Sequence, residues 1–306
     1  MPRLLLLVKP SDLPAYQAAL QTAQLPDLEL VTTPDPDVEI ILGDPALFRS
    51  HLQGLPALRW VQATWAGIES LLDPALRHDY ILTNARGVFG PLMSEYVFSY
   101  LLLRERRILE RLAAQQRNQW SPALTGTLRG KTIGLLGVGS IGAHLASTAR
   151  HFGMTVRGYT RASESCQAVD RYYHGEDLLK FASGLDVLVN VLPNTPATHT
   201  IVDAEVLNAL ADQAVLINAG RGSALDDSAL LAALQSKRLS AAVLDVFREE
   251  PLPPSHPFWG VDNLYITSHT AAPSFPQDLA NLFIENYRLY INNRPLQYQV
   301  SFEQGY

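Results

Sequence analysis

The stretch Thr132–Ala146, TIGLLGVGSIGAHLA, decides the fold. It begins with an apolar run typical of a buried strand, reaches a turn with three glycines at Gly137, Gly139 and Gly142, and continues with helical periodicity. This order predicts the first strand, turn and helix of a dinucleotide-binding domain. Gly137 permits the tight turn, Gly139 lets the backbone approach a pyrophosphate, and Gly142 lets the helix pack closely on the strand. The alternative is a strand–helix turn that binds nothing.

The next predicted strand, VRGYT at 156–160, ends where NAD-binding domains usually carry an acid, about twenty residues after the glycine turn. This chain has Thr160 and Arg161 there. Thr160 cannot repel a 2′-phosphate and can donate a hydrogen bond, and the planar guanidinium of Arg161 can pair with that phosphate. The pair predicts NADP(H) as the cofactor. The alternative is that Arg161 is a solvated surface charge or stacks on adenine without contacting the phosphate.

Short apolar runs separated by helical segments extend this pattern in both directions, as expected for βαβ units with parallel strands. The predicted strands of the first block lie at 3–8, 28–33, 38–43, 59–63 and 81–85. Those of the second block lie at 132–137, 156–160, 186–192, 214–220, 241–247 and 264–268. The fold class is therefore α/β, with doubly wound parallel sheets.

Two predicted helices set the domain boundaries. Residues 91–120 are predicted to form one long amphipathic helix that leads into a linker at 121–130. A helix at about 276–292 follows the last strand of the second block and can return to the first block. We therefore expect a discontinuous substrate domain, 1–92 plus 276–306, and a dinucleotide-binding domain, 93–275.

Composition excludes several classes of protein. The chain has 306 residues, of which 47% are hydrophobic and 18% charged, and its net charge of −6 comes without a basic stripe, so nucleic acid is not an expected partner. The longest N-terminal apolar run, Leu4–Val8, is too short for a signal peptide or a membrane span. The single cysteine, Cys166, rules out an internal disulfide, and the eight histidines form no metal-binding pattern. We expect a cytoplasmic protein without a metal.

Polar side chains with redox chemistry follow three successive strands of the second block. Arg221 follows the first, Asp245 and Glu250 the second, and His269 the third. The carboxyl ends of parallel strands lie at one edge of a sheet, so these side chains can converge. Arginine can bind a carboxylate bidentately, and a histidine beside a carboxylate can transfer a proton to a ketone oxygen. Considered alone, each of these residues is better explained as a loop or surface group than as a catalytic residue.

Longer motifs resemble the D-isomer-specific 2-hydroxyacid dehydrogenases. In the second block, the segments that carry this resemblance are GLLGVGSIG, NVLPNTPATHTIV, LINAGRGSALDDSALLAAL, AAVLDVFREEPLPPSHPFW and ITSHTAA. RWVQATWAGIESLL and TNARGVFGPLMSEYVFSYLL are similar to the family's substrate domain. The missing acid, LPNTP and the terminal Gly-Tyr are similar to the glyoxylate/hydroxypyruvate reductase type within the family.

The resemblance implies a role for each matching residue. Arg221 binds substrate, Glu250 pairs with the histidine, and His269 is the acid–base residue. The cofactor-binding set is Gly137, Gly139, Ser140, Ile141, Gly142, Thr160, Arg161, Leu192, Pro193, Thr198, Ala219, Gly220 and Asp245, of which Asp245 holds the nicotinamide carboxamide. The substrate-binding set in the first domain is Trp65, Ala66, Gly67 and Val88; Trp65 could equally be a core residue.

The resemblance also implies two Rossmann/flavodoxin-like domains with an active-site cleft between them, and a homodimer. We therefore predict an NADPH-preferring reductase of small 2-keto acids, converting glyoxylate to glycolate and hydroxypyruvate to D-glycerate, with NAD(H) also possible. Two alternatives stay open. One is a dehydrogenase for another D-2-hydroxy acid, and the other is a nucleotide-sensing protein that binds a partner.

Overall fold

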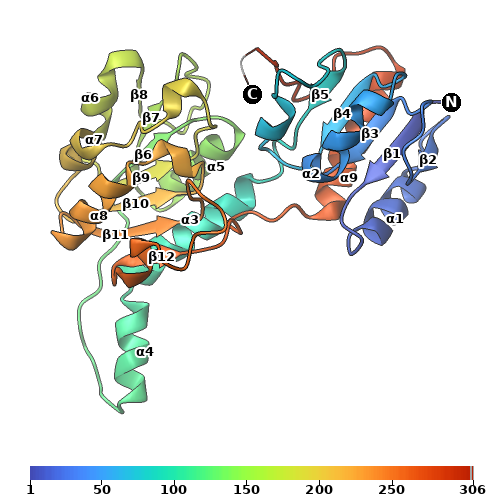
Figure 1. Ribbon diagram of the computed structural model, residues 1–306. Coiled ribbons are helices and arrows are strands. Elements are labelled where there is room, and N and C mark those ends of the chain that lie inside the picture. The colour runs from blue at the N-terminus through green and yellow to red at the C-terminus, as the bar shows by residue number, and fades with distance from the viewer. Residues whose placement is uncertain (304, 306) are drawn as a thin grey trace. The chain divides into compact units, whose positions relative to one another are not determined.

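The computed structural model describes residues 1–303 and residue 305. The chain divides into two compact units (Figure 1). Unit 1 comprises residues 1–88 and 274–306, and unit 2 comprises residues 89–273. Tyr306, the second residue of the terminal Gly-Tyr pair, lies outside the described residues.

Unit 1 is built on a five-stranded parallel sheet with the order β2-β1-β3-β4-β5. Its strands are β1 (Arg3–Leu7), β2 (Glu29–Val31), β3 (Ile40–Gly43), β4 (Trp60–Ala63) and β5 (Ile81–Thr83). This is the flavodoxin-like order, in which the direction of winding reverses between β1 and β3. The central strands are apolar on both faces because helices cover both faces.

The last helix of the chain completes unit 1. Helix α9 (Pro276–Ile291) packs beside α1 (Leu13–Ala23), and its Phe283 stacks on Trp60 with the ring centroids 5.0 Å apart. The other face carries α2 (Pro45–Phe48) and the short turns η1 (Arg49–Gly54) and η2 (Glu69–Leu71). Val300 then donates its N–H to the carbonyl of Leu82 at 2.8 Å, so the C-terminal segment lies against β5.

Unit 2 is built on a seven-stranded parallel sheet with the order β12-β11-β10-β9-β6-β7-β8. Its strands are β6 (Thr132–Leu136), β7 (Thr155–Tyr159), β8 (Arg171–Tyr173), β9 (Val187–Asn190), β10 (Ala214–Asn218), β11 (Leu239–Leu244) and β12 (Leu264–Ile266). The order is that of a Rossmann sheet extended by one strand. The direction of winding reverses between β6 and β9, and ligands of such sheets bind outside the carboxyl ends of the strands at that point.

Helices cover both faces of this second sheet. One core contains α3 (Gly90–Glu105) and α5 (Ser140–His151), and the other contains α6 (Leu178–Ala182), α7 (Ala204–Ala209) and α8 (Asp227–Gln235). Short turns η3 (Gly175–Asp177), η4 (Pro196–Thr198), η5 (Gly222–Ala224) and η6 (Pro257–Gly260) lie in the loops. Helix α4 (Ile108–Gln116) projects away from the sheet (Figure 1).

The prediction of one long helix over 91–120 was wrong. The structure has two helices, α3 and α4, separated at Arg106 and Arg107, and Arg107 has a left-handed backbone with φ 52°. The apolar stripe of α3 ends at Leu101, because the next positions on that face are Arg104 and Glu105. Glu105 accepts a hydrogen bond from Lys131 Nζ at 2.6 Å, and its carbonyl accepts the N–H of Gly126 at 2.9 Å, so the end of α3 is held by the segment at 126–131.

Strand β8 was not predicted. It is three residues long and reads Arg-Tyr-Tyr, and as an edge strand it pairs only with β7. An edge strand needs no continuous apolar run, and this one gave no pattern to detect. It matters because it ends beside Thr160, whose N–H donates to the carbonyl of Tyr173 at 3.1 Å.

Candidate active site

The glycine turn lies between β6 and α5, at the switch point of the unit 2 sheet. Gly137 has φ 98°, a conformation that favours glycine. A Cβ on Gly142 would lie 2.1 Å from the carbonyl oxygen of Gly137, whereas one on Gly139 would meet no atom within 4 Å. Space beside Gly139 and the helix N–H groups from Ser140 and Ile141 onward, which no side chain caps, suit a pyrophosphate.

The turn after β7 carries Thr160 and Arg161. Thr160 is 8% exposed, and its hydroxyl donates to the carbonyl of Ser163 at 2.7 Å. The single hydroxyl hydrogen of Thr160 is therefore committed within the turn. Arg161, the next residue, is exposed. No carboxylate occupies the end of β7, so this position fits a cofactor with a 2′-phosphate.

A buried amide pair organises the loops after β9 and β10. Asn190 donates to the side chain of Asn218 at 2.8 Å, and both side chains are fully buried. Asn190 Oδ1 accepts the N–H of Leu192, and Asn218 Oδ1 also accepts the N–H of Gly220, each at 3.2 Å. Farther along the first loop, Thr198 donates to the carbonyl of Pro193 at 2.7 Å. The asparagine pair thus holds Leu192 and Gly220, and a separate hydrogen bond holds Thr198 to Pro193.

Arg221 follows β10, where Asn218 donates to its carbonyl oxygen at 3.0 Å. Its guanidinium donates to the carbonyl of Gly220 at 2.7 Å, and Ala219 is buried at the strand end. A Cβ on the following Gly222 would lie 1.9 Å from the carbonyl carbon of Phe247. The loops after β10 and β11 therefore touch backbone to backbone beside Arg221.

His269 and Glu250 form a direct pair. His269 Nδ1 lies 2.8 Å from Glu250 Oε2, and both side chains are partly exposed. The other carboxylate oxygen of Glu250 accepts the N–H of Phe247 at 2.8 Å, which fixes the carboxylate on its own loop. A carboxylate at Nδ1 holds the hydrogen on that nitrogen and leaves Nε2 as the reacting nitrogen.

Asp245 holds the loop that carries His269. Its carboxylate is 1% exposed and accepts the Thr267 hydroxyl at 2.6 Å and the N–H groups of Thr270 and Ala271 at 2.8 and 3.0 Å. Tyr96 lies 2.8 Å from the Thr267 hydroxyl, and burial raises the pKa of Tyr96, so it stays a donor. The Asp245 carboxylate thus acts within the protein, in addition to the carboxamide contact expected from its position.

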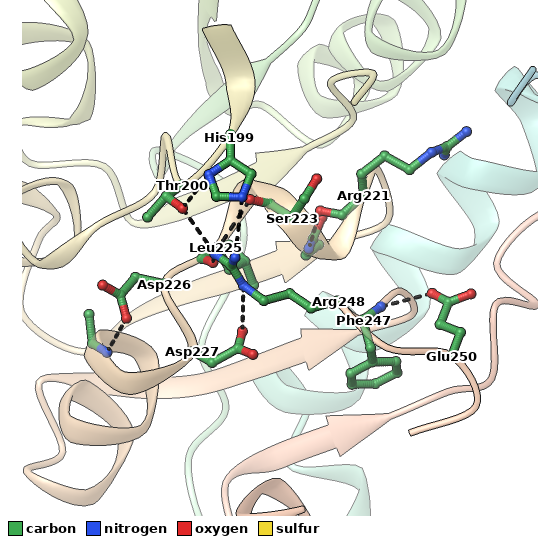
Figure 2. A network of polar contacts seen from close by, with 12 residues as sticks. His199, Thr200, Arg221, Ser223, Leu225, Asp226, Asp227, Phe247, Arg248 and Glu250 are labelled. Atoms are coloured by element: carbon green, nitrogen blue, oxygen red, sulfur yellow. Dashed lines mark hydrogen bonds and ion pairs between the residues drawn. The ribbon is translucent and has the colours of Figure 1, made fainter. Parts of the chain in front are cut away.

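Arg248 joins three loops of the site (Figure 2). Its guanidinium donates to Thr200 Oγ1 at 3.0 Å and to the carbonyl of Leu225, and it lies 3.8 Å from the carboxylate of Asp227. These partners belong to the loop after Thr198 and to the segment that follows Arg221. Figure 2 shows the side chain of Arg221 extending away from this network. Arg248 itself stands two residues before Glu250.

The predicted substrate residues of unit 1 lie at the carboxyl end of β4 and after β5. Trp65 is partly exposed and therefore is not a core residue, unlike Trp60. Its carbonyl accepts the N–H of Ala85 at 3.1 Å, and the carbonyl of Ala66 accepts Asn84 Nδ2 at 2.8 Å. Gly67 follows in the same loop, and Val88 is the last residue of this part of the unit.

Sequence reasoning missed Asn190, Asn218 and Arg248. Each asparagine ends an apolar strand, and a polar side chain at that position was the available indication that a loop is anchored there. Arg248 gave no comparable indication, because its partners lie up to 49 residues away along the chain. Within residues 1–303 and 305, no three metal-binding side chains cluster and no helix is long and apolar enough to cross a membrane.

A Rossmann sheet with a glycine turn at its switch point, and a paired histidine at the same edge, define an NAD(P)-dependent oxidoreductase. The model of the family described as D-isomer specific 2-hydroxyacid dehydrogenase, NAD binding domain, matches residues 98–271. The chain belongs to this family, which confirms the resemblance, the enzyme class and the predicted fold class of two parallel-sheet α/β domains.

Similar proteins agree with this assignment. A protein of Yersinia enterocolitica named glyoxylate/hydroxypyruvate reductase A is 32% identical over 90% of this chain and 89% of its own length. A crystal structure of a D-isomer specific 2-hydroxyacid dehydrogenase family protein from Aeromonas salmonicida is 40% identical, with a TM-score of 0.91 over 98% of this chain and 99% of that one. An NADPH-dependent glyoxylate/hydroxypyruvate reductase from Sinorhizobium meliloti, solved with NADP and sulfate, is 28% identical, with a TM-score of 0.86 over 100% of both chains.

Proposed function

We propose that this enzyme is an NADPH-preferring reductase of small 2-keto acids, with glyoxylate and hydroxypyruvate as substrates. The observation that carries the proposal is the His269–Glu250 pair, 2.8 Å apart, at the sheet edge that also carries Arg221 and the glycine turn. The names of the similar reductases from Yersinia enterocolitica and Sinorhizobium meliloti support the substrate class.

In the proposed reaction, the guanidinium of Arg221 binds the substrate carboxylate and polarises the neighbouring ketone. Glu250 keeps a hydrogen of His269 on Nδ1 and fixes the orientation of the ring. Nε2 of His269 then gives its proton to the ketone oxygen as that oxygen gains negative charge. Asp245 is a positioning residue, because it fixes the loop on which His269 stands.

The cofactor site is proposed to favour NADPH and to accept NADH. Gly137, Gly139 and Gly142 would form the pyrophosphate turn with Ser140 and Ile141, and Arg161 would pair with the 2′-phosphate. Bound reduced cofactor supplies the hydride. Leu192, Pro193 and Thr198 would line the adenosine side, and Ala219 and Gly220 the nicotinamide side. Thr160 contributes chiefly by carrying no charge, since its hydroxyl hydrogen is donated to Ser163.

Unit 1 is proposed to supply substrate contacts from its backbone. The N–H groups of Trp65, Ala66 and Gly67 would bind the substrate carboxylate, and the indole of Trp65 would restrict the size of the substituent. Partial exposure of all three residues supports this role, since a buried loop could not contact a ligand. Val88 would lie near the same group.

The test is consumption of reduced nicotinamide with a panel of 2-keto acids, in the wild type and in His269→Ala and Arg221→Ala. We expect each variant to lose about a hundredfold or more of kcat/KM, a typical loss when a general acid or a charged binding group is removed. NADPH binding, followed by nicotinamide fluorescence, should persist in both. Full activity in either variant would refute the assigned role, and His151→Ala, at an exposed helix end, serves as the control.

We also propose a homodimer formed through α4. Ile108, Leu109 and Leu112 on this helix are 40–49% exposed, and Trp120 beyond it is 96% exposed. Such a group of apolar side chains on a projecting helix is typical of an interface between subunits.

A further inference from the structure

The turn after β7 contains one acid, although none stands at the end of the strand itself. Glu164 stands four residues beyond Thr160 in the exposed loop at 161–165, at the edge proposed to bind the 2′-phosphate of NADPH. A free carboxylate there would repel a phosphate, as the acid at the end of the strand does in NAD-binding domains. A preference for NADPH therefore requires that the negative charge of Glu164 be neutralised by a neighbouring group.

His174 forms an ion pair with that carboxylate. It follows β8, and its Nε2 lies 2.8 Å from Glu164 Oε1. Its Nδ1 lies 2.9 Å from the carbonyl oxygen of Thr160 and 3.1 Å from the Thr160 hydroxyl oxygen. One imidazole thus bridges the first residue of the turn and its acid.

The partners of the ring determine its charge. A carbonyl oxygen can only accept, so Nδ1 carries a hydrogen, and the ionised carboxylate at Nε2 requires a second hydrogen. The Thr160 hydroxyl cannot supply the Nδ1 contact, because it donates to Ser163. The arrangement therefore favours the imidazolium. In agreement, the hydrogen bond to Glu164 raises the pKa of His174 above its ordinary value, and the Thr160 carbonyl adds to the shift.

Other charged groups near the ring do not replace it. Asp177, in the turn after His174, also favours the imidazolium, but its carboxylate pairs with Lys180 Nζ at 2.6 Å. Tyr172 stacks parallel to the imidazole, with centroids 6.3 Å apart. Among these groups, His174 is the cation that contacts Glu164 directly.

We propose that His174 determines cofactor specificity by neutralising Glu164 and fixing the turn that presents Arg161. The inference rests on the proposed use of NADPH. It makes His174 a positioning residue, since it acts through Glu164 and the 160–164 backbone. When the imidazolium is lost, the carboxylate of Glu164 is released beside the phosphate-binding edge.

The experiment is a double-mutant cycle with His174→Ala, Glu164→Gln and the two combined, read out as the dissociation constants of NADPH and NADH by fluorescence titration. We expect His174→Ala to lower the preference for NADPH about tenfold, the size of a screened repulsion between like charges at short range. Adding Glu164→Gln should restore most of the preference. A histidine that only supports the fold would weaken both cofactors alike, and the second substitution would then not rescue selectivity.

Three results would overturn the proposal: an unchanged preference in His174→Ala, no rescue in the double variant, or a wild type that binds both cofactors equally. His174→Asn, which keeps a donor near the Thr160 carbonyl, replaces His174→Ala if the alanine variant fails to fold by circular dichroism. His151→Ala is the control. Because binding is measured without substrate, a wild type that discriminates between the cofactors but reduces no keto acid would refute the proposed reaction and leave this inference standing.

Discussion

At the scale of single residues, the buried Asp245 stabilises an unfavourable backbone conformation at His269. His269 has φ 55°, a left-handed backbone that costs a residue with a side chain about 1–2 kcal/mol. Its N–H donates to the Asp245 carbonyl at 2.8 Å, and the Asp245 carboxylate accepts the next two N–H groups. One acid at the end of β11 therefore holds the loop in the conformation that directs His269 to Glu250.

Asp245→Asn should lower both thermal stability and kcat/KM. An amide presents one accepting oxygen instead of two and turns its NH2 group toward a backbone N–H, and each charged hydrogen bond lost here is worth about 1.5–3 kcal/mol. We expect Tm to fall by several degrees and kcat/KM to fall about tenfold or more. Differential scanning fluorimetry and steady-state kinetics measure the two effects.

Tyr96→Phe is the matched control for Asp245→Asn, because it removes only the outer hydrogen bond to Thr267. Its effects should be smaller in both measurements. An Asp245→Asn protein with the wild-type Tm and a raised KM for NADPH would contradict the loop-positioning role and leave only the carboxamide contact.

At the scale of secondary-structure elements, the site consists of loops at the carboxyl ends of parallel strands, and Arg248 connects them. It reaches the loop after β9 through Thr200 and the segment after β10 through Leu225 and Asp227. Burial raises the pKa of Asp227, and the charge of Arg248 opposes that shift. These loops carry Thr198, Arg221 and Glu250, so the Arg248 side chain contributes to their relative positions.

Arg248→Ala should loosen these loops together. Removal of several hydrogen bonds from a partly exposed guanidinium costs about 1–3 kcal/mol, so we expect kcat/KM to fall about tenfold. Backbone amides at 198–202 and 223–227 should exchange faster with deuterium, which mass spectrometry resolves by peptide. Arg248→Lys should recover part of the loss through Asp227, although an ammonium cannot reproduce the planar fork. Unchanged exchange at both segments would show that Arg248 does not couple them.

The elements that sequence predicts well are those whose pattern is local. The strands β3, β6 and β10 are apolar runs bounded by turns, and the glycine turn has its own spacing, so each could be read from adjacent residues. The break at Arg107 and the edge strand β8 could not, because both depend on partners from other segments: residues 126–131 for the end of α3, and β7 for β8. His174 and Arg248 were missed for the same reason: their partners come from other strands.

At the scale of the whole molecule, the chain crosses between its two units twice, after Val88 and after Pro273. The second crossing returns α9 to the first sheet, where Phe283 and Tyr287 are fully buried. The residues proposed for catalysis, Arg221, Glu250 and His269, all belong to unit 2, whereas unit 1 carries the loop proposed for the substrate carboxylate. In the proposed mechanism, the residues for cofactor binding and proton transfer therefore belong to unit 2, and the loop for substrate selection belongs to unit 1.

The last prediction concerns the dimer proposed to form through the exposed apolar side chains of α4. A projecting helix with Ile108, Leu109 and Leu112 each 40–49% exposed is unfavourable in water, because full burial of such a side chain is worth about 1.5–3 kcal/mol. Leu112→Glu removes one of these contributions and places a carboxylate in the buried interface. We expect the dimer dissociation constant to rise about a hundredfold or more.

Light scattering coupled to size-exclusion chromatography should therefore show a dimer for the wild type and a monomer for Leu112→Glu at micromolar concentration. Leu47→Glu is the matched control, since Leu47 on α2 is 41% exposed but lies in unit 1, away from α4 in the chain. It should remain a dimer. A monomeric wild type, or a Leu112→Glu protein that dimerises as tightly as Leu47→Glu, would place the contact elsewhere or remove it, and the apolar face of α4 would then need another partner.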